Sequence, residues 1–150
     1  MASGSNRATA TRRGFLLLAL SSAPAFAEPA RIAFGTLYKS YGVTGLVFAD
    51  AIVGLANKPV SIVGYLAPPL KAESRFLVLT EQPLALCPFC QSDTDWPTDI
   101  VAVYLRRLAP LQPPGTRLKV EGRLEIGSWT DPENGFVSQL RIVDATLTRA

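Results

Sequence analysis

The 150-residue sequence contains no histidine and only two cysteines. Histidine is the commonest catalytic base near neutral pH and the commonest metal ligand. Its absence excludes histidine-dependent hydrolase triads, and it means that any bound metal must be held by sulfur and oxygen. The two cysteines, Cys87 and Cys90, are separated only by Pro88 and Phe89. All thiol chemistry is therefore confined to one short stretch.

Acidic residues are absent from the first 27 positions, which hold three arginines, Arg7, Arg12 and Arg13. A short apolar run at residues 14–20 follows, and the sequence Ala-Phe-Ala stands at residues 25–27. A basic region, an apolar core and an A-x-A end are the three parts of a secretory signal peptide. The apolar run is too short to span a hydrocarbon core of about 30 Å. We therefore expect residues 1–27 to be a signal peptide that is cleaved after Ala27.

The arginine pair stands in a recognisable context. Residues 11–16, Thr-Arg-Arg-Gly-Phe-Leu, resemble the twin-arginine pattern, which is an address that a receptor reads. An ordinary Sec signal with two adjacent arginines is the alternative. On either route the chain leaves the cytoplasm, and we expect the mature protein, residues 28–150, in the periplasm.

The mature sequence carries no excess of either charge. The leader holds 3 of the 15 basic residues, so 12 basic residues remain against 12 acidic ones. A protein without net charge and without a dense Lys/Arg stripe lacks the electrostatic footprint for nucleic acid or anionic lipid. The one remaining basic doublet, Arg106-Arg107, is typical of a solvated strand end. We expect no nucleic-acid partner and no membrane span in the mature chain.

The first part of the mature sequence is the least patterned. Residues 28–44 predict only an arm that packs on the domain. Apolar residues in 45–56 recur at helical spacing and predict a short helix. That helix is expected to end at Asn57, because asparagine tolerates a left-handed cap and Pro59 cannot continue a helix. Residues 28–57 are thus predicted to be an N-terminal arm and helix.

From residue 58 onward the apolar residues follow the period of two that is typical of strands. Five strands are predicted, at residues 60–66, 76–80, 100–105, 117–126 and 136–147. The second and third are apolar on both faces, which indicates central strands. In the first and fourth, Gly64 and Gly122 interrupt the inward-facing residues, and such glycines let a strand bend sharply.

Length and strand count together predict one domain and a mainly β fold. Five short strands with two bend glycines favour a small five-stranded OB-like barrel over residues 58–150, with the short helix before it. An immunoglobulin-like sandwich is less consistent with the sequence, because it needs more strands. No internal repeat or low-complexity tract is visible in the sequence, and we expect no second domain within it.

The cysteine pair follows the second predicted strand, and two carboxylates, Asp93 and Asp95, come shortly after it. A Cys-x-x-Cys pair supplies half of a tetrahedral zinc site, and these carboxylates are the nearest further ligands. The predicted metal ligands are therefore Cys87, Cys90, Asp93 and Asp95, with zinc or copper as the expected metal. The alternative for the two aspartates is a role in turns.

The same two thiols allow two other roles. A dithiol that cycles with a disulfide is one, although no long helix starts at the pair to stabilise a thiolate and the nearby carboxylates oppose it. A plain structural disulfide is the other, since adjacent thiols oxidise readily outside the cytoplasm. Aromatic residues near this loop are expected either to line a ligand groove or to pack in the core; they are Phe76, Phe89, Trp96, Tyr104 and Trp129.

Several short motifs resemble a family of small exported bacterial proteins defined as a domain of unknown function. They are Lys58-Pro59-Val60, Val63-Gly64-Tyr65-Leu66-Ala67-Pro68 before Leu70, Phe76-Leu77, the cysteine loop, Pro97 with Val101 and Val103, Val120-Glu121-Gly122-Arg123-Leu124 and Gly135-Phe136-Val137-Ser138. The resemblance implies an OB-like barrel in the periplasm, an association with transport systems and metal handling, and no established enzyme activity. Many members of that family carry a cysteine and a histidine in the loop, and this chain departs from them.

These observations favour a non-enzymatic periplasmic binding module. Its Cys-x-x-Cys loop is expected to bind a metal or to dock an envelope transport component. A thiol-disulfide redox protein that uses Cys87 and Cys90 is the alternative, and a barrel with a purely structural disulfide is a third.

Overall fold

Strands make up half of the described residues in the computed structural model, which describes residues 1, 4, 28–42, 45–69, 75–83, 96–110 and 112–150. In chain order the elements are β1 (Ala30–Arg31), the 3-10 helix η1 (Phe34–Thr36), β2 (Tyr38–Ser40), β3 (Val47–Phe48), α1 (Asp50–Gly54), β4 (Pro59–Leu66), β5 (Phe76–Thr80), β6 (Ile100–Leu105), β7 (Arg117–Thr130) and β8 (Val137–Arg149). The prediction of a mainly β fold is confirmed.

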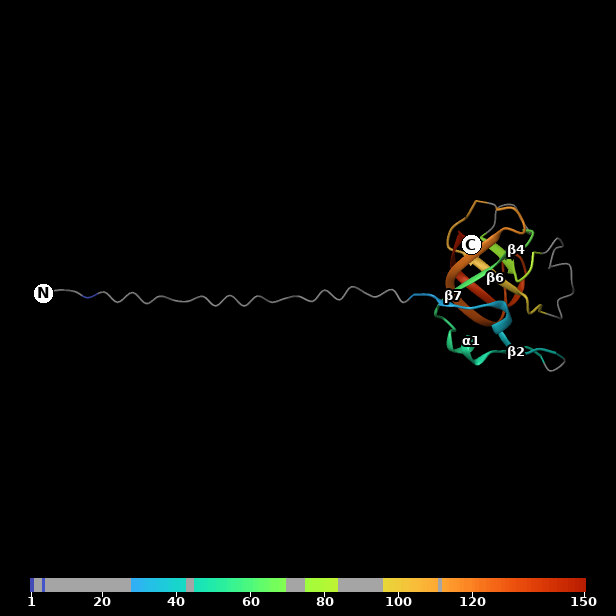
Figure 1. The fold of residues 1–150 in the computed structure, drawn as a ribbon, viewed down its shortest axis with the longest axis horizontal. Coiled ribbons are helices and arrows are strands. Elements are labelled where there is room, and N and C mark those ends of the chain that lie inside the picture. The colour runs from blue at the N-terminus through green and yellow to red at the C-terminus, as the bar shows by residue number, and fades with distance from the viewer. Residues whose placement is uncertain (2–3, 5–27, 43–44, 70–74, 84–95, 111) are drawn as a thin grey trace.

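Six of these strands form one sheet in the order β1-β4-β5-β6-β8-β7, and β4 also pairs with β7. Strands β4, β6 and β7 of this sheet are labelled in Figure 1. Strand β4 runs antiparallel to both β5 and β7, whereas β6 and β8 are parallel. Because β7 pairs back to β4, the pairings of the five longer strands form a closed circuit, and β1 adds to β4 in parallel. Strands β2 and β3 form a separate two-stranded sheet.

The main core lies on one face of these strands. In β4 the buried Val60 and Ile62 alternate with residues of the other face, and in β7 the buried set includes Leu118, Val120 and Leu124. Burying such side chains stabilises the folded state by about 25 cal/mol per Å² of apolar surface removed from water. The period of two in the sequence thus marked the buried faces of β4 and β7 correctly.

A second, smaller cluster covers the other face of β5 and β6. It contains the buried residues Ala67, Phe76, Val78, Ile100 and Ala102, with Trp96, Tyr104 and Phe136 packed against them. Both faces of β5 and β6 are thus buried, as their apolar sequences predicted.

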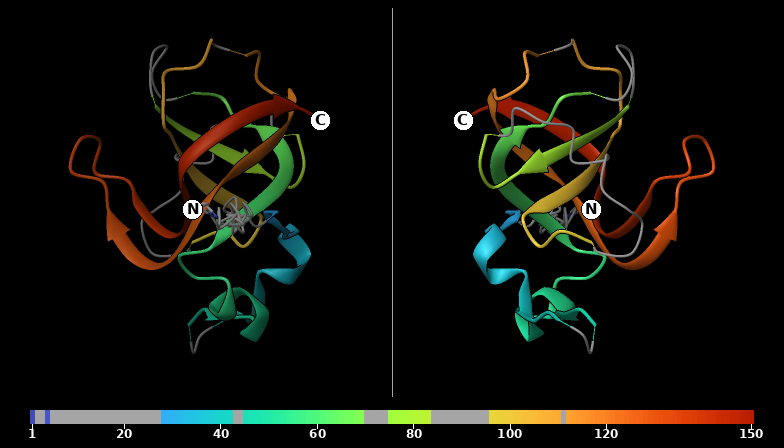
Figure 2. Two further views of the ribbon diagram at one scale, coloured as in Figure 1. Left: turned by 90° about the vertical axis from the view of Figure 1, so that its left-hand side faces the viewer. Right: turned by 90° about the vertical axis from the view of Figure 1, so that its right-hand side faces the viewer.

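The N-terminal segment packs into the main core, as expected of an arm. Phe34, Leu37 and Ile52 are buried there, and η1, β2, β3 and α1 gather at one end of the large sheet (Figure 2). The helix is shorter than the predicted range 45–56, because Val47 and Phe48 pair with β2 as strand β3. After the helix, Asn57 has the left-handed conformation that the sequence predicted, with φ of 63°.

The strand count differs from the prediction of five. Among the described residues the large sheet has six strands and the small sheet two. The additional strands, β1, β2 and β3, are two or three residues long, and so short a segment cannot display a period of two. Strand β7 also runs on past residue 126, so that Trp129 lies inside this strand and not beyond its end.

Candidate functional site

The four predicted metal ligands, Cys87, Cys90, Asp93 and Asp95, lie outside the described residues, as does Phe89. What the structure describes is the frame on either side of them, which ends at Pro83 and resumes at Trp96. The described residues contain no group of three His, Cys, Asp or Glu side chains placed to hold a metal ion. A site built from three such side chains would therefore need at least one ligand from outside the described residues.

The connection that carries the cysteines is closed at its base by hydrogen bonds. The Glu81 amide donates to the Asp99 carbonyl oxygen at 2.9 Å, which extends the pairing of β5 and β6 by one rung. The Thr80 hydroxyl donates to the Gln82 carbonyl oxygen at 2.6 Å. Because β5 and β6 are buried on both faces, this base is part of the rigid sheet.

Trp96 fixes the far end of the same connection. Its Nε1 donates to the Tyr38 hydroxyl at 2.8 Å, and its ring meets Phe136 edge-on at 6.0 Å. Tyr38 in turn packs on Phe48 at 5.4 Å. Burial raises the pKa of Tyr38 to about 12, against a smaller lowering by its hydrogen bond with Trp96. A residue at the end of the cysteine loop is thus tied to the N-terminal arm.

We expect Tyr38→Phe to lower the free energy of unfolding by about 1 kcal/mol at neutral pH, because Trp96 Nε1 loses its acceptor. The change should also reduce the loss of folding stability at alkaline pH. Since the pKa of Tyr38 is raised in the folded protein, its contribution is complete below pH 10 and is lost as the pH rises toward about 12. Urea unfolding between pH 8 and pH 11 measures both effects.

Tyr41→Phe is the matched control, because the Tyr41 side chain is 72% exposed. It should leave both the stability and its pH dependence unchanged. Identical alkaline slopes for the wild type and Tyr38→Phe would contradict the assignment.

Aromatic residues predicted near the loop pack against one another. Phe76 is buried and lies 5.2 Å from the ring of Tyr104 and 5.0 Å from that of Phe136. Tyr104 meets Trp129 edge-on at 5.3 Å. Burial, with the nearby carboxylate of Asp131, raises the pKa of Tyr104 above its ordinary value. These described rings form a packed cluster and leave Trp129 as its solvent-facing end, 37% exposed.

A buried arginine stands behind that cluster, and the sequence did not indicate it. Arg141 is 9% exposed, and its Nε donates to Glu125 Oε2 at 2.8 Å. Its Nη1 donates to the Gly127 carbonyl oxygen at 3.0 Å, and the guanidinium lies 5.1 Å from the centre of the Trp129 ring. This network fixes the long β7–β8 hairpin. Arg141 lies between Leu140 and Ile142 of the main core, so it belongs to the other face of β8, where a charged residue gives no signal of burial.

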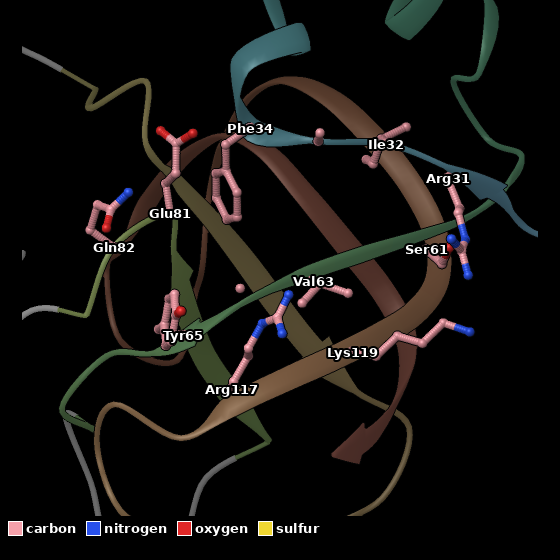
Figure 3. A pocket seen from close by; sticks show the side chains of 12 residues that line it. Arg31, Ile32, Phe34, Ser61, Val63, Tyr65, Glu81, Gln82, Arg117 and Lys119 are labelled. Atoms are coloured by element: carbon pink, nitrogen blue, oxygen red, sulfur yellow. The ribbon is translucent and has the colours of Figure 1, made fainter. Parts of the chain in front are cut away.

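A pocket of about 460 Å³ opens beside β4, and we call it the β4 pocket. Its lining includes Arg31, Phe34, Val63, Tyr65, Arg117 and Lys119 (Figure 3). Strand register brings the cations together: Arg31 of β1 is opposite Ser61, while Lys119 and Arg117 of β7 are opposite Val63 and Tyr65. Sequence reasoning missed this site, because its basic residues come from distant segments.

The β4 pocket carries its charges unevenly. Within the described residues neither Arg31 nor Arg117 forms an ion pair, whereas Lys119 pairs with Glu121. Glu81 also lines the pocket, but Figure 3 shows it at the opposite end from Arg31 and Lys119. One end of the pocket is thus positively charged and the other end is acidic.

Comparison with solved structures shows a shared fold. The chain is similar to the crystal structure of a DUF3299 family protein from Pseudomonas aeruginosa PAO1, with a TM-score of 0.56 and 11% sequence identity. The similarity covers 82% of this chain and 97% of that one. At this identity the match shows a shared fold. No protein-family model and no curated protein matches the sequence. In the described part of the chain, no helix is both long enough and apolar enough to cross a membrane.

Proposed function

We propose that this protein is a non-enzymatic periplasmic binding module whose Cys87/Cys90 loop is its functional face. The observation that carries the proposal is the anchoring of that loop. At its base, the backbone hydrogen bond between Glu81 and Asp99 continues the pairing of the buried strands β5 and β6. At its far end, Trp96 donates a hydrogen bond to Tyr38. A frame that holds both ends of the loop keeps the two thiols close enough to bind one metal ion together.

The scaffold for this face is a five-stranded OB-like barrel with β1 added at one edge. The circuit of pairings β4-β5-β6-β8-β7-β4, with its parallel β6–β8 pair, supports this proposal. The fold shared with a DUF3299 family protein agrees with the resemblance in the short motifs. OB barrels commonly bind ligands through the loops around one face.

The proposed ligand is a borderline or soft metal ion, zinc or copper. Cys87 and Cys90 would supply two thiolates, and Asp93 and Asp95 are the nearest further donors in the sequence. The metal would supply a coordination centre that the two thiolates share. A transport component of the cell envelope is the proposed partner, on the strength of the family resemblance alone.

We expect reduced protein to bind one equivalent of zinc or copper, and expect Cys87→Ser or Cys90→Ser to abolish stoichiometric binding, because either change removes one of the two thiolates and leaves no sulfur pair to hold the ion. Elemental analysis of protein purified from the periplasm and titration of the reduced protein measure this. Ser92→Ala, in the same loop, is the matched control and should bind like the wild type. Asp93→Asn and Asp95→Asn should weaken binding if the carboxylates are ligands.

The alternative functions give different results in the same samples. A redox role requires a measurable dithiol potential and exchange with a model disulfide. A structural disulfide would resist mild reductant, and its removal would change only the melting temperature. If the fully reduced protein takes up no metal in the titration, the binding proposal is wrong.

A further inference from the structure

The β4 pocket has a property that the proposed metal function does not use. Arg31 and Arg117 lie on the rim of a pocket whose floor is partly apolar, and within the described residues they have no carboxylate partner. The mature sequence has equal numbers of basic and acidic residues, so two unpaired guanidinium groups beside one pocket are a local excess of positive charge. Such an excess marks a site for an anion.

Strand register explains why these side chains converge. Val63 and Tyr65 belong to the face of β4 that does not enter the main core, since Val60 and Ile62 face inward. Residues opposite one another in a sheet have neighbouring side chains. The Arg117–Tyr65 and Lys119–Val63 pairs therefore bring both β7 cations to this face, and Figure 3 shows the Arg117 side chain reaching across toward Val63.

We propose that the β4 pocket binds a small soluble phosphomonoester. The guanidinium groups of Arg31 and Arg117, unpaired within the part of the chain that the structure describes, match the charge of a phosphomonoester, which is about −1.5 to −2 at pH 7. Guanidinium groups also present paired N–H donors that suit the oxygens of a phosphate. Lys119 is the weaker contributor, because Glu121 already neutralises it.

The rest of the lining favours an organic phosphate ester over inorganic phosphate. Val63 is 39% exposed, the Tyr65 ring is half-buried, and the buried Phe34 ring closes the floor beside them. A volume of about 460 Å³ is within the range of sites for small organic ligands. Glu81, at the acidic end, repels the phosphate and so favours one orientation, with the phosphate toward Arg31 and Arg117.

The test is calorimetric titration of the full chain with phenyl phosphate. We expect saturable binding, and at least about a tenfold loss of affinity in the Arg31→Gln/Arg117→Gln double variant, because charge-assisted contacts are removed. Arg107→Gln is the matched control, because this arginine is exposed and does not line the pocket. The affinity of this variant for phenyl phosphate should stay within about twofold of the wild-type value. All variants should show the wild-type melting temperature, since both pocket arginines are exposed.

Three further probes separate this ligand class from others. Inorganic phosphate should compete with phenyl phosphate but bind more weakly, because it makes no contact with the apolar floor. Benzoate should bind at least tenfold more weakly than phenyl phosphate, because it carries a single charge. Equal binding of benzoate, or equal losses in Arg107→Gln and the double variant, would overturn the proposal. The proposal would also be overturned if the protein failed to bind phenyl phosphate but sedimented with phosphatidylglycerol vesicles and not with phosphatidylcholine vesicles. Because none of these measurements depends on the cysteines, they are independent of the metal titration.

Discussion

Gly122→Ala is expected to lower the free energy of unfolding by about 3 kcal/mol, at the upper end of the range for overpacked sites. A methyl group at this position would lie 2.6 Å from the Val143 carbonyl oxygen and 2.7 Å from Ile142 Cγ2. It would also lie 3.1 Å from Ala145 Cα. Two of these neighbours are backbone atoms of β8, so no side-chain rotation can relieve the contact.

The close approach at Gly122 has a local cause in β8. The register shifts between Glu121 and Arg123 of β7, and Asp144 of β8 has a φ of 52°, in the left-handed region. An extra residue in one strand of a pair makes a bulge that bends that strand. Here the bulge presses β8 against Gly122, so the glycine and the bulge form one structural unit.

Gly54→Ala is the matched control for this variant. A methyl group on Gly54 meets nothing within 4 Å, and the residue ends helix α1. The substitution should be neutral or should stabilise the protein by a few tenths of a kcal/mol, because alanine restricts the unfolded chain. Urea unfolding of both variants measures the difference. A Gly122→Ala protein as stable as Gly54→Ala would show that β7 and β8 do not approach closely at this point.

The sequence predicted the longer strands well because each has a buried face. For β5 and β6 the predicted ranges agree with the structure at both ends, since apolar residues on both faces are typical of central strands. The same reasoning identified Gly122 as a bend position from its place among alternating residues. It could not indicate the bulge at Asp144, because an aspartate at a bulge inside a strand has the same local sequence pattern as an aspartate in a turn.

The N-terminal segment was harder to predict for a physical reason. Val47 and Phe48 fit the apolar side of a helix, and only their pairing with β2 shows that they form a strand. Such pairing is a tertiary contact that overrides local periodicity. Phe34 gave no signal at all, although it is buried in the main core.

The candidate functional residues divide in the same way. Cys87 and Cys90 were proposed from the sequence alone, because their spacing is itself the signal. The β4 pocket was not, because Arg31 and Arg117 are 86 positions apart in the printed sequence and meet only through the register of β1, β4 and β7. Glu81 connects the two regions: it lines the pocket and also closes the base of the cysteine loop.

Phe34→Ala is expected to lower the free energy of unfolding by about 3–4 kcal/mol, the usual cost of removing a buried phenyl ring. Phe34 is 6% exposed and belongs to the segment before the predicted barrel. Its ring lies on Gly64, where an added methyl group would come within 3.0 Å of Phe34 Cε2 and of the Thr80 carbonyl oxygen. The absence of a side chain on Gly64 thus lets the N-terminal segment pack on β4.

Tyr41→Ala is the control for this loss, because it truncates an aromatic ring that is 72% exposed in the same segment; its effect should be within about 0.5 kcal/mol. A double-mutant cycle then tests the contact itself. Gly64→Ala should cost less in the Phe34→Ala background than in the wild type, by about 0.5–1 kcal/mol, because the ring no longer opposes the methyl group. Some cost should remain, since the Thr80 carbonyl oxygen is unchanged. Strict additivity would mean that Phe34 does not rest on Gly64, and that the N-terminal segment is held to the sheet by other residues.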